Sequence, residues 1–278
     1  MIRRPLNALI LLVFCAAPAW AQNAAPKSKE PLEVTAQKNL EWDRTKKTFT
    51  ARQDAIAKQG LTELHGDTLI AKYIDGKDGK GLNITRIDAT GNVVVISDGS
   101  RATGQQGYYD VADGYSELTG NNLKLTTATD TVTARDKMTY HAAKREMNAW
   151  GNARATRGDD VIVADRLIGR FKEDPETGGS KMDEMEAVDN VVITTPTDIL
   201  YGDRAIYYAG PNTATVTGHV RIERGPNIIT GARGEIDLNT NISRIFGGAG
   251  SATPTSGTDG APVTPGADGR VRGVFYPE

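Results

Sequence analysis

Histidine and acidic side chains are the residues in this sequence best suited to hold a metal ion or to move protons. The three histidines, His65, His141 and His219, occupy three different places in the chain, and none has a cysteine, aspartate or glutamate at a spacing typical of metal ligands. The loop that begins at Asp75 has the composition of a calcium loop, but its twelfth residue is Arg86, where such a loop needs a bidentate glutamate. We therefore expect no metal site and interpret these residues as surface or turn positions.

Catalytic motifs are not found in the sequence either. It contains no Gly-x-Ser-x-Gly elbow, no phosphate-binding glycine loop followed by Lys-Ser/Thr, and no His-Glu-x-x-His helix. Asp159 and Asp160 are paired acids, but neighbouring residues on a strand point to opposite faces and cannot easily act on one substrate. The sequence predicts no catalytic residue, no cofactor and no enzymatic activity.

The first residues have the pattern of an exported protein. Two arginines precede an apolar stretch, which is followed by a small-x-small triplet that ends at Ala21. This pattern predicts a signal peptide, residues 1–21, that is cleaved after Ala21. A retained membrane anchor is the rival interpretation, but a span needs about 20 apolar residues, more than this stretch provides. We expect a periplasmic protein whose single cysteine, Cys15, is lost with the signal and in which residues 22–31 form a short linker.

The charge balance argues against nucleic acid as a partner. The chain has 33 basic and 35 acidic side chains, and removal of the two arginines in residues 1–21 leaves 31 basic side chains and a formal charge of −4. Proteins that bind nucleic acid or anionic membranes normally carry excess Lys and Arg. With 38% hydrophobic and only 6% aromatic residues, the chain is expected to build a thin, extended core.

A repeat of roughly 30 residues is the most informative feature of the sequence. Each unit has a Gly-Asn-like pair followed by alternating apolar residues, and then an alanine or glycine 13 residues after the first member of the pair. One unit has a spacing of 14, which indicates an extra residue near Asn122. The pairs are Gly91-Asn92, Gly120-Asn121, Gly151-Asn152, Asp189-Asn190 and Gly218-His219.

A longer period of 98 residues lies over the short one, because Gly66, Gly91 and Gly104 correspond to Ala164, Asp189 and Gly202. The chain is therefore interpreted as two three-unit modules, at about residues 50–147 and 148–247. Two polar stretches that interrupt the short period, residues 75–88 and 173–186, match each other and are expected to form exposed loops.

Apolar side chains alternate with polar ones inside each unit, which is the period of two expected of a strand that buries one face. We expect strands of about five to eight residues joined by glycine-rich turns, and short helices or none. Repeats that cannot bury their own apolar face must stack on their neighbours, so the sequence predicts an all-β structure with a continuous interior.

The composition changes beyond Gly247 to a tract rich in Gly, Pro, Ser and Thr. Such a tract cannot bury enough apolar surface to order itself, so residues 248–278 are expected to form a flexible tail. Its last residues, Arg270 to Tyr276, regain apolar and basic character. They are either a short docking strand or a chance run of apolar residues.

The segments Thr90 to Val95 and Gly202 to Tyr208, which carry the Gly-Asn-Val-x-Val and Gly-Asp-x-(x)3-Tyr patterns, resemble the periplasmic lipopolysaccharide-transport bridge family (LptA, OstA-like). The resemblance covers about residues 32–247. It implies an elongated open β-jellyroll, or β-taco, that passes lipopolysaccharide from the inner to the outer membrane. Implied partners are an inner-membrane-anchored OstA-like relative, the N-terminal domain of an outer-membrane barrel, and further copies joined head to tail.

The resemblance also suggests a site. Inward side chains would shelter the acyl chains of lipopolysaccharide in an apolar groove, and small alanines, including Ala55 and Ala57, would leave room for them. The alternative is that the same side chains form a closed, dry core in a structural or adhesive β-repeat protein without lipid. The ends of the sheet, expected at Glu33 to Asp43 and at Glu235 to Phe246, would pair with the next molecule by strand addition. The predicted groove residues are Val93, Val95, Leu123, Leu125, Ala153, Ala155, Val191, Ile193, Val220 and Ile222.

Overall fold

The computed structural model describes residues 32–76, 81–97, 99–175, 180–240, 242–248 and 269–276. The predicted signal peptide and linker, residues 1–31, lie outside these ranges, as does most of the predicted tail. The described residues form 18 β-strands and one short 3-10 turn, η3 (Ala142–Lys144), which confirms the all-β prediction. Within these ranges, no helix has the length and hydropathy needed to cross a membrane.

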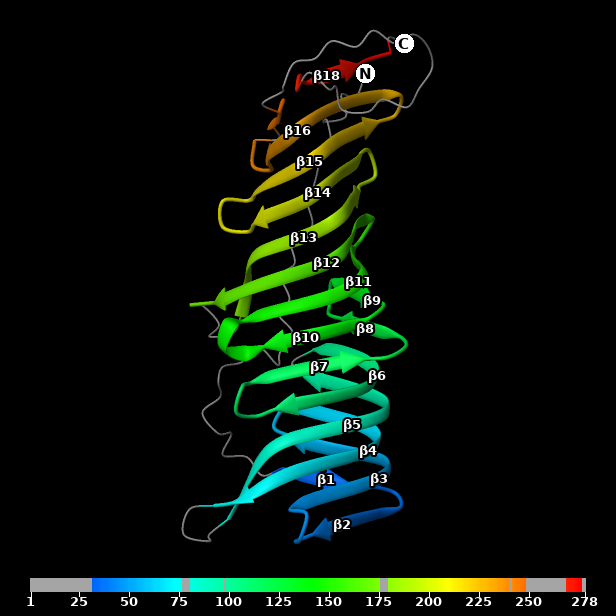
Figure 1. Ribbon diagram of the computed structural model, residues 1–278, viewed down its shortest axis with the longest axis vertical. Helices are drawn as coiled ribbons and strands as arrows, with labels where there is room; N and C mark the ends of the chain where they lie inside the picture. The colour runs from blue at the N-terminus through cyan, green and yellow to red at the C-terminus, as the bar shows by residue number, and fades with distance from the viewer. Residues whose placement is uncertain are drawn as a thin grey trace, which may run out of the picture. The chain divides into compact units, whose positions relative to one another are not determined.

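The strands follow one another along the chain and pair in an antiparallel sense, as β3 does with β4 and β15 with β16 (Figure 1). In order they are β1 (Glu33–Thr35), β2 (Asn39–Asp43), β3 (Thr48–Gln59), β4 (Thr62–Asp75), β5 (Leu82–Ser97), β6 (Ser100–Asp110), β7 (Tyr115–Thr119), β8 (Leu123–Thr126), β9 (Asp130–Ala134), β10 (Lys137–His141), β11 (Glu146–Arg157), β12 (Asp160–Glu173), β13 (Ser180–Thr194), β14 (Ile199–Tyr208), β15 (Thr213–Arg224), β16 (Asn227–Asp237), β17 (Ile242–Phe246) and β18 (Arg272–Val274).

The chain divides into two compact units. Among the described residues, the first unit holds residues 32–153 and 168–182, and so includes β1 to β10. The second holds residues 154–167 and the residues from 183 onward, and so includes β14 to β18. The two three-unit modules inferred from the 98-residue period remain a prediction.

Except for Gly120-Asn121, the Gly-Asn-like pairs lie inside long strands, where they form β-bulges, and are not turns between short strands. The pairing of β5 with β6 skips from Thr90 to Val93, and the two residues between them have left-handed φ angles, 76° at Gly91 and 47° at Asn92. The prediction of strands of five to eight residues is therefore wrong for the main strands, since β3 to β6 have 12, 14, 16 and 11 residues. The sequence could not separate the two cases, because a tight hairpin turn also needs two consecutive residues with positive φ.

A polar side chain from the neighbouring strand closes several of these bulges. The amide of Asn92 donates to both carboxylate oxygens of Asp67, at 3.1 and 3.2 Å. The corresponding amide of Asn190 donates to Asp165 at 2.8 Å. In the last bulge, Nδ1 of His219 lies 2.9 Å from the carboxylate of Asp203, so this histidine is part of a bulge rather than of a turn.

The extra residue near Asn122 divides one strand into two. Gly120 and Asn122 have φ angles of 94° and 62°, and the chain between Thr119 and Leu123 leaves the ladder. The strands on either side, β7 and β8, both pair with β6. The longer break places Leu123 and Leu125 back on the buried face, as the spacing of 14 predicts.

The two polar stretches are not long loops. The ladder between β4 and β5 continues to the pair Asp75 and Leu82, and the amide of Gly76 donates to the carbonyl of Gly81 at 3.0 Å. In the second stretch, β12 ends at Glu173 and β13 begins at Ser180. Most of residues 75–88 and 173–186 is therefore strand. In the first stretch, the alternation of apolar and polar residues is interrupted by one extra residue, Thr85. Arg86 lies opposite Lys72 and Ile84 lies opposite Tyr73, so Thr85 has no residue opposite it on β4.

Part of the predicted tail docks on the sheet. Arg272–Val274 forms β18, which pairs antiparallel with Ile228–Thr230 of β16. The backbone amide of Tyr276 also donates to Oδ1 of Asn227 at 2.9 Å. Of the two interpretations of this segment, the docking strand is the one that the structure shows; residues 249–268 of the tail lie outside the described residues.

Candidate functional site

The buried face of the first unit consists of two rows of side chains, one on each side of the bulges. Each row runs across the strands, and consecutive members of a row lie directly opposite each other on neighbouring strands. Row A contains Ala57, Leu64, Val95, Ala102, Leu125 and Val132. Row B contains Ala51, Leu69, Ala89, Gly107, Leu118, Met138 and Ala149.

The second unit repeats this arrangement on β13 to β17. Its row A contains Ile193, Leu200, Ile222 and Ile229, and its row B contains Ala187, Ala205, Val216, Gly234 and Ile245. Every member of the four rows is an aliphatic residue, a methionine or a glycine. In each unit, we call the surface formed by its two rows, together with the buried residues of the bulges between them, the inner face.

The inner face is covered by the sheet itself. In row B of the first unit, Leu69 is 4% exposed and Leu118 is 2% exposed. Apart from the three residues of η3, the described chain contains no helix that could cover such residues. Bulges bend a strand, so the two halves of each long strand turn toward one another and bury both rows. This folded-over sheet is the predicted open β-jellyroll, and the fold prediction is confirmed.

Large and small side chains fit together on the inner face. A Cβ placed on Gly107 would lie 2.7 Å from Cδ2 of Leu118 and 3.6 Å from Cγ1 of Val93. A Cβ on Gly202 would lie 2.4 Å from Cγ1 of Val216. Leucine and valine side chains therefore occupy the space that these glycines leave, and the inner face is close-packed in this state.

All ten predicted groove residues lie on the inner face. Eight of them are no more than 3% exposed, whereas Val95 and Ile222 are half-buried. In the first unit, Val95 and Leu125 flank Ala102 in row A, and Val93 and Leu123 lie on either side of Gly104. Burial of this degree fits both the groove and the closed core that the sequence left open.

The second unit holds Ala155, Val191, Ile193, Val220 and Ile222. Ile193 and Ile222 both lie opposite Leu200 in row A, and Val191 lies opposite Gly202. Val220 lies opposite Gly231 on β16. Strand pairing thus brings four of the ten residues together in each unit, and the fully buried Ala153 and Ala155 of β11 belong to one unit each.

Row B was missed by sequence reasoning. Ala89 is 3% exposed and Val93 is 1% exposed, so the alternation continues straight through the Gly-Asn pair between them. The same is true of Ala187 and Val191. The alternation of buried residues was present in the sequence on both sides of each pair. It was followed on one side only, because each pair was interpreted as the beginning of a strand.

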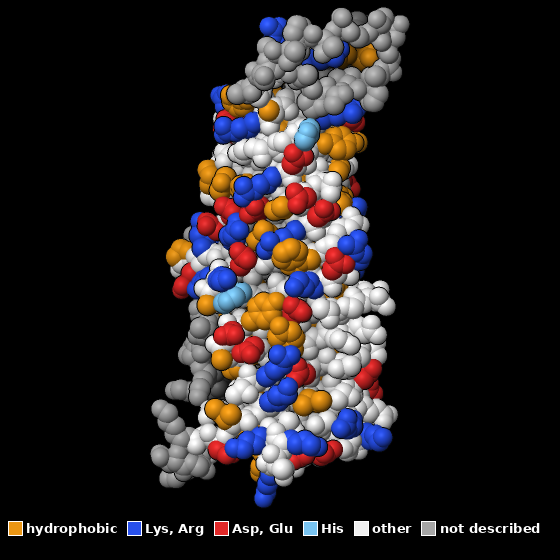
Figure 2. Space-filling view, viewed as in Figure 1, with side chains coloured by type: hydrophobic (Ala, Val, Ile, Leu, Met, Phe, Trp, Pro, Cys, Tyr) orange, Lys and Arg blue, Asp and Glu red, His pale blue; other side chains and the backbone are white. Residues whose placement is uncertain are grey.

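The outer face carries charged and hydrophobic side chains in mixed order, as Figure 2 shows for one side of the molecule. The guanidinium of Arg86 lies 3.9 Å from the ring centroid of Tyr108, whose ring is 5.8 Å from that of Tyr115. The hydroxyl of Tyr115 donates to Glu117 at 2.8 Å. Burial, reinforced by Glu117, raises the pKa of Tyr115, so this group is a structural hydrogen-bond donor rather than a proton-transfer group.

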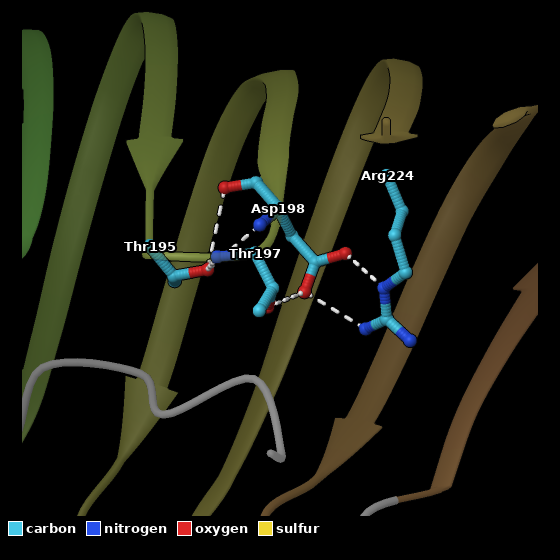
Figure 3. A network of polar contacts seen from close by, with 4 residues as sticks. All are labelled: Thr195, Thr197, Asp198 and Arg224. Carbon is cyan, nitrogen blue, oxygen red and sulfur yellow. Dashed lines mark hydrogen bonds and ion pairs between the residues drawn. The ribbon is translucent and has the colours of Figure 1, made fainter. Parts of the chain in front are cut away.

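A buried carboxylate lies at the hairpin between β13 and β14 (Figure 3). Asp198 is 2% exposed and receives two hydrogen bonds from Arg224, at 2.6 and 2.8 Å, and one from the hydroxyl of Thr197 at 2.7 Å. Its backbone amide donates to the hydroxyl of Thr195 at 3.0 Å. Burial alone would raise the pKa of Asp198, but the bonds from Arg224 and Thr197 outweigh it and lower the pKa.

This arrangement, which we call the corner, consists of the hairpin at Thr195 to Asp198 with its hydrogen bonds and Arg224, and its role is structural. The hairpin at Thr127 to Asp130 repeats its local bonds, with the hydroxyl of Thr129 donating to Asp130 at 2.7 Å and the amide of Asp130 donating to Thr127 at 3.0 Å. A bond pattern used twice at equivalent turns is best explained as a way to close a hairpin. Among the described residues, no three His, Cys, Asp or Glu side chains gather into a group that could hold a metal ion.

Comparison with known proteins identifies the family. The family described as LptA/(LptD N-terminal domain) LPS transport protein matches the chain twice in tandem, over residues 33–146 and 136–242. Among solved structures, the chain is similar to LptH from Pseudomonas aeruginosa, described as the LptA homologous periplasmic component of the lipopolysaccharide transport device; the two share 13% identity over 91% of this chain and 100% of that chain, with a TM-score of 0.20. A comparison with curated proteins gives no match. Because the two family matches together span residues 33–242, the chain belongs to the LptA and LptD N-terminal-domain family of lipopolysaccharide transport proteins.

Proposed function

We propose that this protein is a periplasmic bridge component that holds the acyl chains of lipopolysaccharide against its inner face and leaves the sugars in water. The observation that carries the proposal is the composition of the rows, which cross successive strands without a polar side chain. Family membership supplies the class of ligand. The apolar rows supply a surface on which that ligand's acyl chains are stable.

The energetics fit a ligand with several acyl chains. Burial of each methylene contributes about 0.8 kcal/mol, so one chain of a dozen carbons brings several kcal/mol without any charged contact. The two halves of the folded sheet must separate to admit such a chain. The side chains of a row then contact the acyl chain in place of the opposite half of the sheet. This exchange of one apolar neighbour for another costs much less free energy than exposing the row to water.

The half-buried positions of the inner face are the expected first contacts for the lipid. In the first unit, Leu64 and Val95 of row A are half-buried while Ala102 and Leu125 are 2% and 3% exposed. In the second unit, Ile222 and Ile229 are the half-buried members of row A. We propose that acyl chains enter beside these residues and spread along row A and the predicted groove residues next to it.

Mass spectrometry of the protein purified from its native envelope tests the proposal against a structural or adhesive role. Lipopolysaccharide is expected in near-equal molar amount with the wild-type protein. Val95 and Val94 are neighbours of identical size that point to the inner and the outer face, so they form a matched pair. Val95→Arg should abolish the bound lipid, whereas Val94→Arg should retain it. Absence of lipid from the wild type, or equal loss in both folded variants, would contradict the proposal.

End-to-end association through the strand edges is the second part of the proposal. β1 and β2 pair with β3 and expose Leu40 and Trp42 by 57% and 48%. β17 pairs with β16 and exposes Ile242 and Phe246 by 45% and 40%. Backbone groups on such edge strands are available to another strand. The partners that we propose are a further copy of the chain, the inner-membrane-anchored relative and the N-terminal domain of the outer-membrane barrel.

Chemical crosslinking between two single-cysteine variants tests this association. The mature chain has no other cysteine if the signal is cleaved as predicted. Leu40→Cys and Phe246→Cys proteins, mixed in equal amounts with a bis-maleimide crosslinker, should form mainly heterodimers. Homodimers of Leu40→Cys in equal yield would indicate a symmetric contact and contradict the head-to-tail arrangement.

A further inference from the structure

The sheet edge at the C-terminal end of the second unit is one strand in two pieces. β17 pairs with Arg233–Asp237 of β16, and β18 pairs with Ile228–Thr230 of the same strand. Both run antiparallel to β16 and therefore in the same direction, one after the other. Figure 1 shows β18 next to β16, and both strands belong to the second unit. The edge is complete only when the C-terminal segment is in place.

The interruption between the two pieces is long. The chain leaves the edge after Gly247 and returns at Gly269, where a Cβ on Gly247 would lie 2.0 Å from the Gly269 carbonyl oxygen. Both ends of the interruption therefore lie together, opposite the two residues of β16 between Thr230 and Arg233. At the N-terminal edge of the other unit, by contrast, β1 and β2 are separated by residues 36–38 alone.

The second piece of the edge is held mainly by its backbone. β18 has only three residue pairs with β16, together with the bond from Tyr276 to Asn227. Arg272 is exposed, and Phe275 and Tyr276, the residues next to the strand, are 67% and 60% exposed. A strand that buries so little side-chain surface opens at low cost compared with the rest of the sheet.

The strand that lies under β18 is, in contrast, part of the buried structure. Ile229 is a member of row A, and Thr230 is 2% exposed. Departure of β18 would leave the stretch from Asn227 to Thr230 without its outer partner. This four-residue stretch is long enough to pair with most of β2, which has five residues and carries the exposed Leu40 and Trp42.

We propose that β18 is an autoinhibitory strap that occupies the edge of β16 and must leave before β2 of a second copy can pair there. The proposal rests on the end-to-end association proposed above and adds its regulation. A strap closed about nine-tenths of the time weakens the apparent affinity between copies about tenfold, because only the open fraction can bind. The strap also protects the edge from unspecific strand addition.

Two variants test the strap in opposite directions. A chain that ends after Gly248 lacks the strap, and its self-association, measured by sedimentation velocity, should be about tenfold tighter than that of the full mature chain. Ile228→Cys/Val274→Cys joins two residues that lie opposite each other in the β16–β18 pair. When oxidised it should associate more weakly than the wild type, and reduction should restore wild-type association. Circular dichroism checks that each variant is folded.

A peptide of residues 269–276 provides a separate measurement. Added to the truncated chain, it should suppress association, while a peptide of the same composition in scrambled order should not. Equal or weaker association of the truncated chain, or no effect of the oxidised disulfide, would overturn the strap. Failure of both the full and the truncated chain to self-associate would overturn the end-to-end model as well. Lipid content measured on the same samples reports separately on the lipid-binding part of the proposed function.

Discussion

Substitution of Gly91 tests the bulge that bends β5, so that both halves of this strand contribute side chains to the inner face. Gly91 has a φ of 76°, and a Cβ there would lie 2.1 Å from Oδ2 and 2.9 Å from Cβ of Asp67. Gly99 is a matched control with the same φ of 76° and no atom within 4 Å of an added Cβ. Gly91→Ala and Gly99→Ala therefore share the backbone strain and differ in the contact with Asp67.

The expected magnitudes follow from these contacts. A left-handed conformation costs an L-residue about 1–2 kcal/mol. Replacement of glycine also reduces the conformational freedom of the unfolded chain, which returns about 0.4–1 kcal/mol, so Gly99→Ala should lower the free energy of unfolding by about 0–1.6 kcal/mol. In Gly91→Ala the side chain of Asp67 must also move and give up the bonds from Asn92, which adds about 1–2 kcal/mol. Asp189, 98 residues later, occupies the equivalent bulge position with a φ of 60°. Because a residue with a side chain is accommodated there, Gly91→Ala should destabilise the protein without preventing folding.

Urea unfolding followed by circular dichroism measures the difference between the two variants. Gly91→Ala should lose about 1–2 kcal/mol more than Gly99→Ala, and most of this excess should disappear in an Asp67→Ala background. Equal losses at Gly91 and Gly99 would refute the reasoning, because they would show that the contact between the bulge and Asp67 contributes nothing.

Two further predictions concern the corner and the inner face. Asp198→Asn should lower the free energy of unfolding by about 2 kcal/mol at neutral pH, because the two bonds from Arg224 lose their charged acceptor. The folded-state pKa of Asp198 is lowered, so its stabilisation is present above the unfolded pKa of about 3.9 and is lost as the pH falls through the folded value. Unfolding measured across pH should therefore show the wild type and Asp198→Asn converging in acid, and a constant gap between them would contradict the assignment. Leu118→Ala, at a residue 2% exposed, should cost about 2–5 kcal/mol, while Leu61→Ala, at one 78% exposed, should stay within about 0.5 kcal/mol. Similar losses in the two leucine variants would mean that row B is not a packed face.

The buried face could be predicted from sequence because burial of one side of a strand leaves a direct trace. Val93, Val95, Leu123 and Leu125 follow the period of two, and the structure places all four on the inner face. The extra residue near Asn122 was also detectable, because it shifts the alternation by one place. The periplasmic bridge function did not follow from these patterns, and was implied by the resemblance of the repeat to a known family.

Other features leave no such trace. A Gly-Asn pair serves a turn and a bulge equally well, since both need consecutive residues with positive φ, and row B was missed for this reason. The extra residue at Thr85 hides the continuation of β5 into the polar stretch. β18 has three residues and buries little side-chain surface, so only its partner on β16 distinguishes it from a chance apolar run.

Photocrosslinking tests the central claim, that acyl chains lie on the inner face, most directly. A photoreactive amino acid is placed at Leu64 or at Ile222, the half-buried inner positions, and at Lys124 as an exposed control on the opposite face. Irradiation of the folded protein with lipopolysaccharide should give a covalent lipid adduct at Leu64 and at Ile222 and none at Lys124. An adduct at Lys124 equal to those at the inner positions, or none at either inner position while lipid is bound, would contradict the account.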